Sequence, residues 1–282
     1  MERLTLEERQ EVQERYPETY FPDPVLEPIW FGKRPDTRIE GKKAVIDQKT
    51  NEVFGICSDI YQIVHYEDLV KMTELTVEQM PEFGNIKITP KVFNGGSKLD
   101  IIAKFTDVEY EIKKGDFINP SIHIRSSYDL GWKLTSLFGA FRIVCSNGMT
   151  VGNVFSKFAR RHVVSLDPSL LRDNILEGMG HYSEQVGLWK DWAETKINAL
   201  VYKNIWDALP FSDKEKEKIE NLPETESKMV LSDKKWRDEA SLWDVHSIIS
   251  QFVTHEIKSE LRKAELGPIV ANIFESVGKE CL

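Results

Sequence analysis

The chain has few cysteines, no long apolar run and none of the common nucleotide or metal motifs. Its 282 residues include three cysteines, Cys57, Cys145 and Cys281, which lie far apart and form no C-x-x-C spacing. This excludes a disulfide framework and a zinc ribbon, and it indicates a reducing compartment. No run approaches the roughly 18 apolar residues that span a bilayer, and the first ten residues lack the apolar core of a signal peptide. We therefore expect a soluble, cytoplasmic protein that is not exported and has no membrane partner.

Nucleotide and metal sites have little support in the sequence. The glycines of Gly95-Gly96-Ser97-Lys98 do not have the spacing of a phosphate-binding loop, and a turn accounts for them. No G-x-G-x-x-G follows a predicted strand. The six histidines show neither H-x-x-x-H nor H-E-x-x-H spacing. We therefore expect no cofactor and no metal, and the sequence identifies no catalytic residue.

The net charge of −9 is unevenly distributed. Residues 1–83 carry 10 basic and 18 acidic side chains, residues 84–162 carry 12 and 6, and residues 163–282 carry 15 and 22. The middle third is therefore basic between two acidic flanks. An acidic whole-chain balance argues against nucleic acid as a ligand, but the middle third keeps that class of partner open.

The first 40 residues predict a short helix followed by an extended strap. Residues 4–15 predict the helix, because Thr5 and Glu8 form a capping box at its start. Five of the twelve prolines lie between Pro17 and Pro35, interleaved with aromatic residues, which excludes a helix there. Such a strap lies either across its own domain or across a neighbouring subunit. We favour its own domain, because exposed aromatic residues are otherwise a liability.

Residues 41–165 predict a β-rich core, and residues 166–282 an acidic helical region. Two short strands at 43–47 and 53–56 and a helix at 66–80 come first. A strand over 86–93, which Pro90 confines to an edge or a bulge, then begins a series of alternating segments. In the segment around residue 124, the alternation turns His123 and Arg125 outward. A short helix over 154–162 follows. The fold class is α+β, with an antiparallel meander or hairpin core, packed helices and an all-helical C-terminal region.

Basic and aromatic residues alternate through the middle third in a pattern typical of single-stranded nucleic-acid binding. Cations track phosphates, and aromatic faces stack on bases. The alternative is an ordinary solvated sheet face with aromatic residues in the core. The candidate binding residues are Lys87, Lys91, Lys98, Lys104, Arg125, Lys133, Arg142, Lys157, Arg160, Arg161, Tyr128 and Trp132.

Cys145 is the most plausible nucleophile, with His162 or His123 as its base. A thiol at a strand end could lie near a helix N-terminus that lowers its pKa. We favour the other interpretation, in which Cys145 packs as a small apolar residue, because no signature of a thiol enzyme accompanies it.

Two blocks carry a family resemblance. The stretch 54–64 (FGICSDIYQIV) and the stretch 141–149 (FRIVCSNGM) resemble the phage/plasmid-like proteins grouped as a domain of unknown function. In that family a Y-x-I/V block precedes an R-V-V-C-x-N block. The resemblance implies a phage or mobile-element origin and a soluble intracellular protein. The layout of hairpin, helix, meander and helix is also similar to that of single-strand annealing recombinases of the Red-beta type. Those proteins form rings or filaments that hold single-stranded DNA without ATP.

We therefore expect a non-enzymatic protein that binds single-stranded DNA, assembles with itself into a ring or filament, and anneals strands. A phage nuclease or a host replication protein is a further expected partner, and the host cytoplasm is the expected location. Two other classes stay open. One is a thiol- or metal-assisted hydrolase that uses Cys145 or His123. The other is an adaptor that binds protein through the proline strap and the acidic helices.

Overall fold

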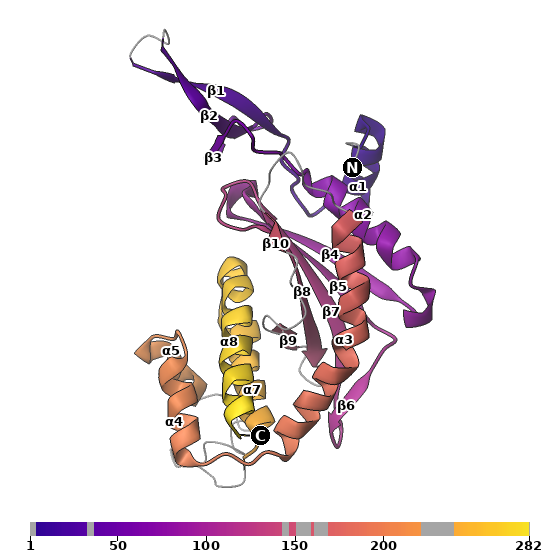
Figure 1. Ribbon diagram of the computed structural model, residues 1–282, viewed down its shortest axis with the longest axis vertical. Coiled ribbons are helices and arrows are strands. Elements are labelled where there is room, and N and C mark those ends of the chain that lie inside the picture. Colours follow the sequence, from indigo (N-terminus) through magenta and orange to yellow (C-terminus); the bar gives the residue numbers. More distant parts are fainter. Residues whose placement is uncertain are drawn as a thin grey trace. The chain divides into compact units, whose positions relative to one another are not determined.

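The computed structural model describes residues 4–32, 37–142, 147–150, 159–160, 169–220 and 240–281 (Figure 1). These residues form two compact units. Unit 1 comprises residues 1–105, 122–136 and 156–176, and unit 2 comprises residues 106–121, 137–155 and 177–282. Antiparallel sheets and helices make up both, so the predicted α+β class is confirmed. The units interleave along the chain, and the boundaries predicted at residues 40 and 165 stay predictions.

Unit 1 begins with helix α1 (Leu6–Arg15) and a three-stranded antiparallel sheet. The predicted capping box forms, because Thr5 Oγ1 accepts from the Glu8 backbone while the Glu8 carboxylate accepts from the Thr5 backbone. Strands β1 (Pro24–Phe31), β2 (Thr37–Asp47) and β3 (Val53–Ser58) pair in the order β1-β2-β3. Within the proline-rich segment, residues 24–31 are thus extended, as the prolines require.

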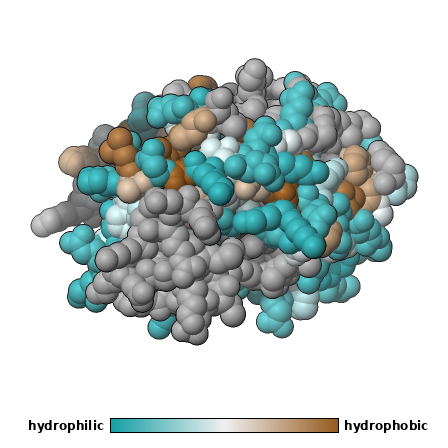
Figure 2. Space-filling model, turned by 90° about the horizontal axis from the view of Figure 1, so that it is seen from below, coloured by the Kyte–Doolittle hydropathy of each residue, from teal (hydrophilic) through white to brown (hydrophobic). Residues whose placement is uncertain are grey.

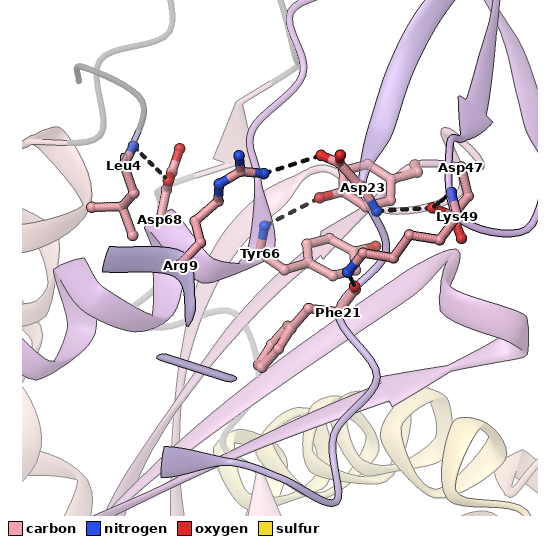
Figure 3. A network of polar contacts seen from close by, with 9 residues as sticks. Leu4, Arg9, Phe21, Asp23, Asp47, Lys49, Tyr66 and Asp68 are labelled. Carbon is pink, nitrogen blue, oxygen red and sulfur yellow. Dashed lines mark hydrogen bonds and ion pairs between the residues drawn. The ribbon is translucent and has the colours of Figure 1, made fainter. Parts of the chain in front are cut away.

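Polar contacts hold the segment that precedes β1 against its own unit (Figure 3). Asp47 Oδ1 accepts from the backbone N–H of Asp23 at 2.9 Å and of Lys49 at 3.1 Å. Lys49 Nζ donates to the carbonyl of Phe21, and Arg9 pairs with Asp23 at 3.1 Å. The Phe21 side chain is fully buried. At residues 21–23, therefore, the strap lies on its own unit.

The core of unit 1 lies between helix α2 (Tyr66–Glu78) and the hairpin of β4 (Ile86–Phe93) and β5 (Lys98–Phe105). The short helix η1 (Pro81–Phe83) leads into β4, and the turn η2 (Asn94–Gly96) joins the two strands. Gly95 and Gly96 have φ values of +66° and +108°, which only glycine adopts without strain. Leu69 of α2 and Leu99, Ile101 and Phe105 of β5 are fully buried.

Strands β4 and β5 belong to a second, seven-stranded sheet. Its other strands are β6 (Tyr110–Lys113), β7 (Asp116–Ser127), β8 (Leu134–Arg142), β9 (Asn147–Thr150) and β10 (Ala159–Arg160). The strand order is β10-β8-β7-β5-β4, with β6 beside β7 and β9 beside β8. Among the described strands β4 lies at an edge, as Pro90 predicts.

One predicted helix is wrong where the structure describes it. Residues 159 and 160 were expected in a helix over 154–162, but they form β10, which pairs with Thr135 and Leu134 of β8. Hydrogen bonds to a neighbouring strand outweigh the local helix preference of a short segment. The other residues of that predicted helix lie outside the described ranges.

The helices after residue 169 are α3 (Ser169–Glu194), α4 (Ala199–Ala208), α5 (Asp213–Glu220), α7 (Leu242–Gln251), the π turn η4 (Phe252–Glu256) and α8 (Glu260–Cys281). This confirms the helical C-terminal region. In unit 2, Trp192 of α3, Trp243 and His246 of α7, and Phe274 of α8 form a buried aromatic cluster.

In the described part of the chain, the helices are all too short or too polar to cross a membrane. The coloured residues on the face shown in Figure 2 are mostly hydrophilic.

Gly278 of α8 is a sensitive position in unit 2. A Cβ added there would lie 2.4 Å from Nε1 of the buried Trp192, so the indole or the helix would have to move. We expect Gly278→Ala to lower the free energy of unfolding by about 1–3 kcal/mol, the usual cost of overpacking. Denaturant unfolding measures this. Gly187→Ala in α3, where nothing lies within 4 Å of the added Cβ, is the control, and an equal loss there would contradict the steric explanation.

Candidate nucleic-acid interface

Four of the predicted lysines lie on one face of the β4–β5 hairpin. Lys87 and Lys91 are two pleat repeats apart on β4, and Lys98 and Lys104 occupy matching positions on β5. The register pairs Lys87 with Lys104, and residues directly opposite each other in antiparallel strands point to the same side. The structure therefore brings these four residues together on what we call the lysine face: Lys87, Lys91, Lys98 and Lys104.

The pair Lys87–Lys104 places two positive charges directly opposite each other. Like charges directly opposite each other in two strands are destabilising. Lys87 is exposed and Lys104 is half-buried. Burial lowers the pKa of Lys104, and the charge of Lys87 lowers it further. A bound anion between the two ammonium groups would relieve this repulsion.

Aromatic residues lie at the other end of the lysine face. Lys98 Nζ is 4.9 Å from the centre of the Trp132 ring, and Phe93 meets the same ring edge-on at 6.3 Å. Lys98 also pairs with Asp129 at 3.5 Å. Trp132 lies in the loop between β7 and β8. Its backbone N–H donates to Ser127 Oγ at 2.8 Å, which fixes the loop. Trp132 as a residue is half-buried, and its ring lies beside a cation.

A buried ionic cluster lies next to this aromatic end, on the same strand face. Asp100 of β5 accepts from Arg125 Nε at 3.2 Å and Nη2 at 3.1 Å, and both its oxygens lie 3.2 Å from His123 Nδ1. Burial would raise the pKa of Asp100, but the charges and hydrogen bonds of Arg125 and His123 hold it well below its ordinary value. The Arg125 guanidinium is 5.6 Å from the Trp132 ring centre, so the cluster also supports that ring.

The outward orientation predicted for His123 and Arg125 is wrong. Both residues are 7% exposed, because their partner, the Asp100 carboxylate, is itself buried on β5. Alternation along a strand separates two faces, but it does not show whether the second face is also covered. The Arg125 guanidinium is occupied by Asp100, and we do not include it in the proposed binding surface.

Tyr128, a further predicted binding residue, is buried in the core of unit 1. Its side chain is 0% exposed, its ring stacks on Tyr66 at 4.1 Å, and its hydroxyl accepts from the Tyr66 backbone at 3.1 Å. A ring enclosed in this way has no face left for a base, and we leave it out of the proposed surface.

The remaining predicted residues are placed less fully. Lys133 is exposed and directly precedes β8. Arg142 ends β8 and Arg160 lies in β10, and only their backbone is described. Four residues of the sequence-based hypotheses lie outside the described residues: Cys145, Lys157, Arg161 and His162.

Sequence reasoning missed Phe93, Asp100 and Asp129 as parts of this region. The period of two along residues 86–105 places Phe93 and Asp100 on the lysine face, so that signal was available. No sequence signal pointed to Asp129, because its contact with Lys98 depends on the loop before Trp132.

Fold and site together define an α+β protein with a basic and aromatic β-hairpin face. The family described as "Domain of unknown function (DUF932)" matches residues 53–269, more than half of the chain, and the chain belongs to this family. Both sequence blocks that carried the resemblance fall within the matched range. No curated protein and no solved structure matches the chain. Among the residues that the structure describes, no three His, Cys, Asp or Glu side chains gather as a metal site would require.

Proposed function

We propose that this protein binds single-stranded DNA and anneals complementary strands, without ATP and as a homo-oligomer, in phage-type recombination. One observation carries the proposal: the lysine face places four lysines on one hairpin, beside the rings of Phe93 and Trp132. Single-stranded nucleic acid is bound by this combination of cations and aromatic rings.

The proposed mechanism assigns one task to each kind of side chain. The lysines hold phosphates, and the exposed part of Trp132 stacks on a base. The pairing edges of the bases then stay free for a second strand. The resemblance to phage/plasmid-like proteins and to Red-beta type recombinases supports the annealing role and the phage origin. The acidic flanks of the chain would limit non-specific binding and offer a surface to a nuclease or a replication protein.

A salt titration tests the proposal. The affinity for a labelled single-stranded oligonucleotide should fall steeply as salt rises. Each phosphate contact adds about 0.7 to the slope of log K against log salt, so four lysines predict a slope of about −3. Fluorescence anisotropy at several salt concentrations measures it, with a duplex of the same sequence alongside.

Annealing is measured separately, from the pairing of two complementary labelled strands without nucleotide. The protein should accelerate it. Absence of binding at low salt would refute the proposal, and binding without faster annealing would reduce it to a DNA-binding protein. The hydrolase and adaptor alternatives stay predictions from the sequence.

A further inference from the structure

The distal half of the β1–β2 hairpin carries large exposed aromatic side chains. Trp30 is 50% exposed, Phe31 is 70% exposed, and the six residues at the start of β2 (37–42) are all exposed. In Figure 1 these two strands form a ribbon that extends beyond β3. We call Trp30, Phe31, Arg38 and Lys42 the distal ribbon. Exposed apolar side chains gathered in this way mark an interaction surface.

The strand register places an aromatic ring beside a cation on this ribbon. Trp30 is directly opposite Arg38, so both side chains point to one side, while Phe31 is opposite Thr37. The register shifts between Pro28 and Trp30, and Gly41 of β2 has a φ of +70°. Such an irregularity increases the local twist of a two-stranded ribbon.

The charge of the ribbon favours a polyanion as its occupant. Residues 28–32 and 37–43 carry three basic side chains, Arg38, Lys42 and Lys43, against one acidic side chain, Glu40. Residues 1–83 as a whole are acidic, so the ribbon is a local exception. The cores of protein–protein interfaces are depleted in lysine, whereas sites for single-stranded nucleic acid combine basic and aromatic residues.

We propose that the distal ribbon is a second contact for single-stranded DNA, in which Trp30 and Phe31 stack on bases and Arg38 and Lys42 meet phosphates. This inference rests on the proposed function, and it adds a binding element outside the basic middle third. No predicted site residue lies on the ribbon.

The test compares a double variant, Trp30→Ala with Phe31→Ala, with a control, Leu6→Ala with Leu200→Ala. The two leucines are each 66% exposed and lie on α1 and α4. Because stacking on each ring contributes at least about fivefold in affinity, the ribbon variant should bind a single-stranded oligonucleotide at least about 25-fold more weakly. The control should bind like the unmodified protein.

A second oligonucleotide of equal length with abasic sites separates stacking from charge. The unmodified protein should prefer normal bases, and the ribbon variant should lose most of that preference. Arg38→Glu, which leaves both rings in place, should weaken binding to both oligonucleotides. An oligonucleotide carrying 5-iodouracil should crosslink to a peptide within residues 24–32.

Several results would overturn the inference. The first is equal affinity of the ribbon variant and the unmodified protein. Another is a crosslink confined to other peptides. A third is a change in self-association, seen by sedimentation without loss of DNA affinity, which would identify a second copy of the chain as the occupant. If the unmodified protein binds DNA and the ribbon variant is unchanged, only the ribbon inference fails. If the unmodified protein does not bind, the proposed function fails as well.

Discussion

Reversing both opposed charges, Lys87→Glu with Lys104→Glu, is expected to lower the affinity for single-stranded DNA about tenfold or more at low salt. The two residues are directly opposite each other in the strand register, so one stretch of phosphates would meet both side chains. The variant removes two contacts and adds two repulsive charges. The slope of log K against log salt should become shallower by about 1.4. Fluorescence anisotropy at four or more salt concentrations gives both quantities.

The matched control is Lys214→Glu with Lys218→Glu on α5, two exposed lysines in the acidic C-terminal region. It changes the net charge of the chain by the same amount. An equal loss of affinity in this control would show that bulk charge controls binding, and it would contradict the assignment to the lysine face.

The single variant Lys87→Glu separates binding from folding, because its two effects have opposite signs. It turns a repulsive cross-strand pair with Lys104 into an attractive one, which should stabilise the folded chain by about 0.2–1 kcal/mol. The affinity for DNA should nevertheless fall. A variant that is more stable but binds less well cannot owe its weaker binding to damage of the fold.

The grouping of the four lysines could be predicted from the sequence because it depends on two local rules. Alternation fixes which residues of each strand share a face, and the turn at Asn94, Gly95 and Gly96 fixes the register of the hairpin. Given both, Lys87 and Lys104 have to be neighbours.

The burial of Arg125 and Tyr128 could not be predicted from alternation along the strand. Both lie in or next to β7, where the residues of the two faces are equally buried. Whether a polar strand face is covered depends on segments far away in the sequence, and on partners such as Asp100 that no local pattern reveals. The helix predicted for the residues of β10 is wrong for a related reason, since pairing with a neighbouring strand determines the conformation of so short a segment.

For the distal ribbon, burial was expected but exposure is found. Its prolines correctly predicted an extended chain, and Phe21 confirms that the strap packs on its own unit at that point. The same argument, that exposed aromatic residues are a liability, does not hold for Trp30 and Phe31. Composition describes the strap as one segment, but its two ends lie in different surroundings.

Asp100→Asn is expected to lower the free energy of unfolding by about 3–5 kcal/mol at neutral pH, because it leaves the Arg125 guanidinium buried without a counter-charge. Asparagine keeps the size of the side chain and can still accept a hydrogen bond, so the lost quantity is mainly the charge. Asp59→Asn, at an exposed position, should change stability by no more than about 0.5 kcal/mol. Denaturant unfolding of the three proteins measures the difference.

The pH dependence of that difference identifies its cause. The pKa of Asp100 is held well below its ordinary value, chiefly by Arg125 against the opposing effect of burial. Its stabilising contribution is therefore complete above the unfolded pKa of about 3.9, and it is lost as pH falls toward the pKa of the folded state. The gap between the unmodified protein and Asp100→Asn should thus be constant from about pH 7 to pH 5 and narrow in stronger acid. A gap that stays the same down to pH 2 would mean that packing, and not the charge of Asp100, accounts for the loss. Because Arg125 also lies against Trp132, the variant should weaken DNA binding even under conditions in which it stays folded.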